Sequence, residues 1–571
     1  MQPLDFVVLV TTMVAVSAYG ILKSRSKVEN NAKDFVVGSD MSAWSVALSV
    51  CSGFISSISL LGFPSEVFYN GPMIIWYALM YVIAFPIVAY VFLPVTYNLR
   101  LTSAYEYFEL RFNRTCRSIA AGLFCTEILL YNAVALYAPS VAISALLDIH
   151  ILISILLTAA LAATYISAGG AKAGIHTSAA QMVLIVASMT LIVAISMWKE
   201  DISKIIDNVI DGNRARLVEF RPDPRIRHSA YSLVFGGTGT ILALFAANQM
   251  SLQKYMSMPT LKMAQKVVLL NIPCNLFILF VYVIIGLIIF GVYHDCVPML
   301  NSKNELLPYY VLDRMSAIPG FTGMFAVAIY SAGISTLSST FSSGNAVVIE
   351  DIIVPLLEIF NMPNLNDKTR KLIMRIFPIA LAIFAIGLAL VCSILDSLVL
   401  QLAFSIFGVV GGPVLGLFIL GVLVPYVKGR AATIAFIISI IASFGTAIGA
   451  FYNKVAPIAL PLNTYCTNTT FSYSIANNSM YNTVTEIDGW WGLQYLRISY
   501  QYYSLVGVIT SLFVGITAQA LLKSDSELKV DSRLLSPILR TSNATNRENV
   551  RSYLLLHVFE RIQFRIHASF F

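Results

Sequence analysis

Thirteen long apolar runs, separated by short polar segments, limit the folds that this chain can adopt. A helix needs about 20 mostly apolar residues to cross the hydrocarbon core of a bilayer, and within lipid it satisfies its own backbone hydrogen bonds. The sequence therefore predicts an all-α polytopic membrane protein with about thirteen transmembrane helices. The expected spans cover residues 5–22, 43–64, 72–98, 118–146, 151–168, 176–198, 230–252, 265–292, 320–348, 374–395, 397–425, 431–452 and 500–522.

The distribution of charge predicts the orientation in the membrane. Only 12% of the residues are charged, about half the share of a soluble protein. With the N-terminus outside and the C-terminus inside, 26 of the 37 Lys and Arg residues face the cytoplasm, as the positive-inside rule requires. None of the 37 lies in the middle of an expected span, since Lys266 and Arg375 stand at the cytoplasmic ends of theirs. The net charge of +7 then faces anionic lipid, so the expected partner is the lipid bilayer and not a nucleic acid.

The longest polar stretches lie near the C-terminus. The loop 453–499 falls outside in this topology and carries two sequons, so we expect glycosylation at Asn468 and Asn477. Cys296 and Cys466 are the two cysteines placed outside, where they either form a disulfide or remain free thiols. Residues 524–571 form a cytoplasmic tail whose end is either an amphipathic helix on the membrane or disordered.

Two expected spans contain helix-breaking residues. The segment 48–72 holds Gly53, Gly62 and Pro64, and the segment 234–249 holds three glycines between 236 and 239. The two segments lie five spans apart, which indicates two inverted repeats of about 43–198 and 230–425 with a binding site where the helices break. The alternative is that these glycines serve close helix packing.

Hydroxyl side chains gather in one expected span. Eight of the fifteen residues from 331 to 345 are Ser or Thr. Neutral oxygen atoms suit an alkali cation that must bind and then leave, although such hydroxyls can also bond back to their own helix. Helical spacing places two facing stripes of serines on this span and on the first broken one: Ser335, Ser339 and Ser342, and Ser52, Ser56 and Ser59.

Acidic residues are rare within the expected spans. Glu127 is either an ion-path carboxylate or a partner of a neighbouring hydroxyl or of Asn132, whereas Glu66 near the outer mouth is expected to be positional. The chain shows no catalytic triad, phosphate loop or metal motif, so we expect neither an enzyme nor a cofactor.

Five motifs resemble the sodium:solute symporter family, in the branch that holds the sodium-coupled monocarboxylate, multivitamin and iodide transporters. The resemblance covers residues 5 to 523 and implies a thirteen-span fold with a five-plus-five inverted-repeat (LeuT-like) core and Na+ as the coupling ion. Residues 1–523 are then one symporter domain. The motifs are PVTYNLRLTSAYEYFELRFNRTCR (94–117), LYAPSVAISAL (136–146), NQMSLQKYMSMPTLKMAQK (248–266), LAFSIFGVVGGPVLGLFILGVLVP (402–425) and ISYQYYSLVGVITSLFVG (498–515).

The same resemblance implies two sets of site residues. The sodium site would use the backbone carbonyls of Ser52, Ile55 and Ala332 and the side-chain hydroxyls of Ser335 and Thr336. The substrate cavity would be lined by Phe54, Ser59, Ile241, Phe245 and Phe404. The chain departs from relatives at three places, with Ile241 where Trp is usual, Phe245 where Tyr is usual and Ser178 where Asp is usual. These departures predict an apolar pocket and leave the number of coupled sodium ions open.

The predicted function is sodium-coupled uptake of a small organic anion, a monocarboxylate or a vitamin-like acid, across the plasma membrane. With no Lys or Arg expected at depth, the anion would be held by backbone N–H groups near residues 236–239, by hydroxyls and by the sodium ion. The alternatives are a symporter for an inorganic anion or a sugar, and a transport-silent sensor or sodium-leak channel on the same fold. The oligomeric state stays open.

Overall fold

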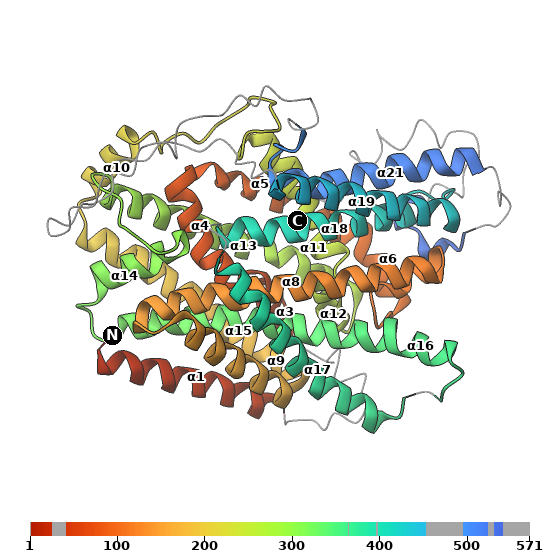
Figure 1. The fold of residues 1–571 in the computed structure, drawn as a ribbon, viewed down its shortest axis with the longest axis horizontal. Helices are drawn as coiled ribbons and strands as arrows, with labels where there is room; N and C mark the ends of the chain where they lie inside the picture. The colour runs from red at the N-terminus through yellow and green to blue at the C-terminus, as the bar shows by residue number, and fades with distance from the viewer. Residues whose placement is uncertain are drawn as a thin grey trace.

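The computed structural model describes residues 2–24, 42–363, 365–394, 398–452, 495–522 and 530–540, and within them every regular element is a helix (Figure 1). The longer helices are α1 (Pro3–Ser24), α3 (Ala43–Phe54), α4 (Ser57–Asn70), α5 (Tyr77–Ile87), α8 (Arg114–Leu147), α9 (Ile151–Lys199), α10 (Ile202–Asp211), α11 (Gly237–Ala246), α13 (Leu261–Val292), α14 (Leu306–Met315), α15 (Phe321–Val347), α17 (Asp367–Cys392), α18 (Val399–Leu423), α19 (Gly429–Tyr452) and α21 (Tyr503–Leu522). The shorter helical elements are η1 (Pro72–Trp76), η2 (Val88–Phe92), α6 (Leu93–Leu99), α7 (Glu106–Arg111), η3 (Ser232–Gly236), α12 (Gln249–Met256), η4 (Lys303–Glu305), η5 (Val348–Ile353), α16 (Val354–Ile359), η7 (Tyr500–Tyr502), η8 (Ser532–Leu534) and α22 (Pro537–Arg540).

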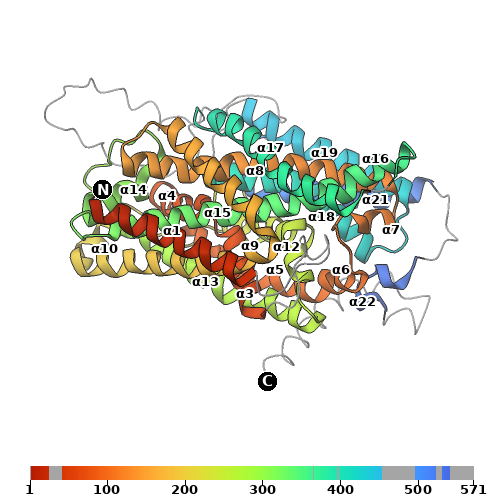
Figure 2. The same ribbon diagram turned by 90° about the horizontal axis from the view of Figure 1, so that it is seen from below.

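The connecting segments lie at the two ends of the helix bundle. The start of α1 lies at the same end as α10 and α14, whereas α7, α16 and α22 lie at the opposite end (Figure 2). This is the arrangement expected when successive spans alternate in direction. The central helix is α15, whose most apolar window is 94% buried by neighbouring helices.

The number of spans is lower than expected in the described residues. Nine helices are long and apolar enough to cross a membrane, or up to eleven if each of two bent pairs forms one span. The shorter apolar helices Pro3–Val16 and Ile151–Ala160 account for part of the difference. The expected spans 151–168 and 176–198 belong to one 49-residue helix, α9, which continues through the segment GGAKAGI (169–175) between them despite its three glycines. A count of thirteen therefore stays a prediction.

Both interrupted helices are confirmed, but their breaks do not lie at the expected glycines. Helices α3 and α4 meet at 58° around Ile55, and α12 follows α11 at 49° around Ala247. Polar side chains cap the new helix starts, because Ser56 accepts a hydrogen bond from the N–H of Ile58 and Asn248 accepts one from the N–H of Met250. The breaks thus follow capping residues, which place helix N-termini inside the bundle.

The glycines instead allow close helix packing, the alternative that the sequence had left open. A Cβ atom on Gly62 would lie 2.7 Å from the Leu400 side chain, and one on Gly236 would lie 2.5 Å from the Gln501 carbonyl oxygen. Because η3 and α11 run on from one another through residues 236–239, their N–H groups stay within a helix. The expectation that these N–H groups hold an anion is therefore wrong.

The signature motif 94–117 and the start of the tail form a cap at the α7 end. Arg111 donates hydrogen bonds to the carbonyls of Gly421 and Val424, which end α18. The Tyr107 hydroxyl donates to the carbonyl of Leu534, so residues 530–540 dock onto the bundle. This docking could not be predicted from the sequence, because its hydrogen bonds are accepted by main-chain carbonyls, which every residue has.

The predicted outer modifications fall mostly on residues that the structure does not describe. Cys296 is disulfide-bonded, whereas the thiols of Cys51, Cys116, Cys125, Cys274 and Cys392 are free. Cys466, Asn468 and Asn477 lie outside the described residues, so the pairing and both glycosylation sites stay predictions.

Candidate functional site

The expected sodium ligands converge where α15 crosses the end of α3. The Ser52 and Ser335 hydroxyl oxygens lie 2.7 Å apart, and the Ser335 hydroxyl also approaches the Ser52 carbonyl oxygen at 3.2 Å. Thr336 donates to the carbonyls of Ala332 at 3.1 Å and Gly53 at 3.4 Å. All of these residues except Gly53 are among the expected sodium ligands. The cluster offers hydroxyl and carbonyl oxygens without a formal charge, a donor set that fits Na+.

Ile55, the remaining expected sodium ligand, stands at the helix break between α3 and α4. Its backbone has left the helical conformation, with φ −78° and ψ 81°. Among the described residues its carbonyl accepts no hydrogen bond, so the oxygen remains available for a cation. Ile55 also lines a cavity beside the break.

A cavity with an empty volume of about 640 Å³, part of which is open to solvent, lies beside the break. All five residues expected to line a substrate site border it: Phe54, Ser59, Ile241, Phe245 and Phe404. The rings of Phe54 and Phe245 are 4.4 Å apart and form an apolar floor across the two broken helices. The structure thus brings together groups from α3, α4, α11 and α18 around one space.

The cavity contains polar groups that the sequence analysis missed. Tyr81, Tyr131, Asn275 and Tyr282 line it, so the pocket is less apolar than expected. The Tyr282 hydroxyl is buried and has no hydrogen-bond partner in the described part of the chain. Asn275 and Tyr282 are seven residues apart on α13, and this helical spacing of two polar residues was the available signal.

Most serines of the two stripes bond within their own helices. Ser59 donates to the Ser56 carbonyl, and Ser339 donates to the Ser335 carbonyl. Ser342 accepts a hydrogen bond from the Gln253 amide on α12. The stripes therefore meet only at Ser52 and Ser335, and a continuous path of facing hydroxyls is not formed.

Glu127 has a different partner from those considered. It is buried and accepts a hydrogen bond of 2.8 Å from the Asn248 amide, at the break of the second interrupted helix. Asn132 instead accepts a hydrogen bond from Thr340. Glu127 therefore ties α8 to the start of α12.

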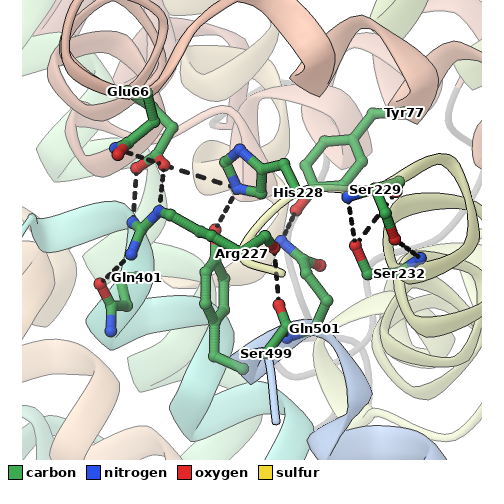
Figure 3. A network of polar contacts seen from close by, with 11 residues as sticks. Glu66, Tyr77, Arg227, His228, Ser229, Ser232, Gln401, Ser499 and Gln501 are labelled. Atoms are coloured by element: carbon green, nitrogen blue, oxygen red, sulfur yellow. Dashed lines mark hydrogen bonds and ion pairs between the residues drawn. The ribbon is translucent and has the colours of Figure 1, made fainter. Parts of the chain in front are cut away.

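A buried ion pair joins α4 and α18 to the polar segment that precedes η3 (Figure 3). The Glu66 carboxylate on α4 binds the Arg227 guanidinium through two contacts of 2.6 and 2.8 Å. The other side of the guanidinium donates to Gln401 on α18 at 2.7 Å. Glu66 is thus positional, as expected, and its partner comes from the polar segment between α10 and η3.

Aromatic and amide groups extend this network down to the cavity. His228 and the Tyr500 hydroxyl lie 3.1 Å apart, and Gln501 donates to the Tyr77 hydroxyl (Figure 3). Burial lowers the pKa of His228 to about 4, so its imidazole is neutral at pH 7. The Tyr77 ring stacks on Phe404 at 5.5 Å, and Phe404 lines the cavity. The network therefore reaches the wall of the pocket through Tyr77 and Phe404.

Lys254 lies inside the helix bundle, which corrects the expectation that no basic side chain would lie at depth. It belongs to α12, the second half of an interrupted span, and only 7% of the residue is exposed. Its ammonium group donates to the Ser49 carbonyl on α3 at 2.7 Å. Its place after the expected span 230–252 predicts a cytoplasmic loop, but α12 packs inside the bundle against α3 and α15.

Known proteins resemble this chain in sequence and in fold. The chain is 33% identical over 540 residues to sodium-coupled monocarboxylate transporter 1 of Mus musculus, covering 90% of this chain and 86% of that protein. It is 31% identical over 549 residues to sodium-coupled monocarboxylate transporter 2 of the same species, covering 94% and 86%. The solved structure of a Na+-coupled sialic acid symporter has the same fold, with a TM-score of 0.73 and 22% identity over 91% of this chain and 98% of that one.

The sequence profile of the sodium:solute symporter family matches residues 35–439, which is most of the chain. The relatives are transporters and not enzymes, and Na+ is their coupling ion. The protein is a multi-pass membrane transporter that belongs to the sodium:solute symporter family.

Proposed function

We propose that the protein imports a small organic anion, a monocarboxylate or a vitamin-like acid, together with Na+ across the plasma membrane. One observation carries this proposal. Ile55 follows Ser52 of the oxygen cluster by three residues, stands at the helix break and lines the cavity, so a cation and a solute would bind beside one helix break. Binding of either would order the same residues, which is the requirement for coupling.

The cation would be held by the oxygen atoms that already gather there. The hydroxyls of Ser335 and Thr336 would turn from the carbonyls of α3 toward Na+, while the carbonyls of Ser52, Ile55 and Ala332 complete the ligand set. The broken helices contribute no charged ligand. A neutral set binds a cation weakly enough for its release, as a transport cycle needs.

The solute would occupy the cavity between the two interrupted helices. Its carboxylate would meet the Tyr282 hydroxyl and the Asn275 amide, and its alkyl part would contact Ile241 and Phe245. Among the described residues no Lys or Arg borders the cavity, so the bound sodium supplies the balancing charge. The likeness to the two monocarboxylate transporters favours a small carboxylic acid over a sugar.

Uptake into proteoliposomes tests this proposal. We expect labelled lactate, pantothenate or biotin to accumulate against its gradient when Na+ is present outside, and not when choline replaces Na+. Labelled iodide and glucose serve as the competing solutes. Preferred uptake of iodide or glucose would show that the solute is not a small organic anion. Sodium current without solute would indicate a leak channel, and neither uptake nor current would indicate a sensor.

The orientation with the N-terminus outside predicts that the loop 453–499 is glycosylated. Enzymatic deglycosylation should increase the gel mobility of the wild-type protein, and combining Asn468→Gln with Asn477→Gln should abolish this shift. Asn543→Gln, in a sequon of the C-terminal tail, is the matched control and should leave the shift unchanged. A shift that persists in the double variant would place another sequon outside and contradict the orientation.

A further inference from the structure

Lys254 occupies an unusual position for a lysine in a membrane protein. It is buried on α12, and within the described residues no carboxylate lies within 4.0 Å of its ammonium group. Charged side chains at depth are normally paired or reach the interface, because an unpaired charge in a low-dielectric interior is costly. A single carbonyl, that of Ser49, accepts its hydrogen bond at 2.7 Å. This position is therefore not explained by an ion pair.

The chain makes room for this ammonium group beside the oxygen cluster. A Cβ atom on Gly53 would lie 2.6 Å from Lys254 Nζ and 3.3 Å from the Ser339 hydroxyl oxygen. Only glycine at this position allows the amine to approach the helix so closely. The Gly53 carbonyl is the one that faces Thr336, and Ser339 donates to the Ser335 carbonyl. The positive charge is thus adjacent to the residues that form the cluster.

The charge lies close to the residues of the cluster, because its hydrogen-bond partner Ser49 precedes Ser52 by nearly one turn of α3. The cavity wall includes Phe54 and Ile55, which follow Ser52 in the chain. A cation bound at Ser52 and Ser335 would therefore be near both the solute and a positive charge. Two like charges about 10 Å apart change a binding constant by about tenfold or more when water is largely excluded.

We propose that the Lys254 ammonium group is a positive charge that lowers the affinity of the oxygen cluster for Na+. This inference rests on the proposed sodium site. Lys254 acts as a positioning residue through its charge and is not a ligand. Its repulsion keeps sodium binding weak in the absence of solute, and an organic anion bound in the cavity offsets it. The same charge then speeds release of the ion after the solute has left.

Neutralising the charge without shortening the side chain tests the proposal. We expect Lys254→Met to decrease the half-saturating Na+ concentration about tenfold, measured as ²²Na+ binding to the purified protein without solute, while slower sodium release reduces turnover in uptake assays. Lys254→Arg, which keeps the charge, should restore the wild-type sodium affinity. Lys262→Met removes an exposed lysine from the start of α13 and is the matched control, with no expected change.

The outcomes separate this inference from the proposed sodium site. If Ser335→Ala leaves ²²Na+ binding unchanged, the sodium site itself is wrong. If Ser335→Ala weakens binding but Lys254→Met leaves it unchanged or weaker, only the role of Lys254 is overturned. If Lys254→Met does not fold, Gly53→Ala serves instead, because its methyl group displaces the ammonium group while the chain keeps its charge. Failure of Gly53→Ala to tighten binding would also overturn the proposal.

Discussion

Replacing Arg227 by methionine is expected to abolish transport and to destabilise the protein by about 3–5 kcal/mol, the usual effect of removing one partner of a buried ion pair. Glu66 is completely buried, and the Arg227 side chain is only 7% exposed. The variant therefore leaves a carboxylate without its two charged contacts, and it disconnects α4 from Gln401 on α18. Thermal unfolding in detergent measures the stability, and uptake normalised to surface expression measures transport.

The same polar segment supplies a matched control. Arg225 pairs with Asp223 at 2.8 Å, but both side chains are partly exposed. Arg225→Met should therefore cost less than about 1 kcal/mol, as exposed ion pairs do. The double variant Glu66→Gln with Arg227→Gln removes both charges and should recover much of the stability. Equal stability of Arg227→Met and Arg225→Met would show that the buried ion pair does not stabilise the fold.

Alanine at Ser335 or Thr336 is expected to raise the half-saturating Na+ concentration for uptake by about fivefold to a hundredfold. Each change removes one oxygen ligand, and an uncompensated polar contact of this kind is worth about 1–3 kcal/mol. Surface expression should be preserved, since both side chains are small. The sodium dependence of uptake at a saturating solute concentration is the measurement.

Ser343→Ala is the control for this pair of variants. Ser343 lies on the same helix and is equally buried, but its hydroxyl bonds only to carbonyls of α15 itself. Its loss should leave the sodium dependence unchanged. If Ser335→Ala and Thr336→Ala behave like Ser343→Ala, the hydroxyls of α15 serve helix packing and the sodium site lies elsewhere.

Sequence patterns were sufficient to predict the helices and the oxygen-bearing groups that gather on one helix. Apolar length predicts most spans, because a membrane requires a minimum run of apolar residues. The hydroxyl content of 331–345 located the oxygen cluster, since Ser335 and Thr336 lie in a helix that carries no charged residue. The family resemblance added the cavity residues, and the structure gathers all of them in one space.

The tertiary structure alone decided which distant side chains meet. The partner of Glu66 lies 161 residues away, and that of Lys254 lies 205 residues away on a backbone carbonyl. No local period encodes such contacts. The direction of α12 after its bend brings Lys254 into the bundle, although its sequence resembles that of a cytoplasmic loop.

The sequence by itself therefore determined the membrane class, the family and the oxygen-rich helix, because these depend on composition and on spacing within one helix. The tertiary structure decided where the helices break, which glycines serve packing and which charges are buried, because these depend on how separate helices cross. Ile55 shows the difference most clearly. Nothing in its apolar side chain marks it, yet the fold places it at the break between α3 and α4 and in the wall of the cavity.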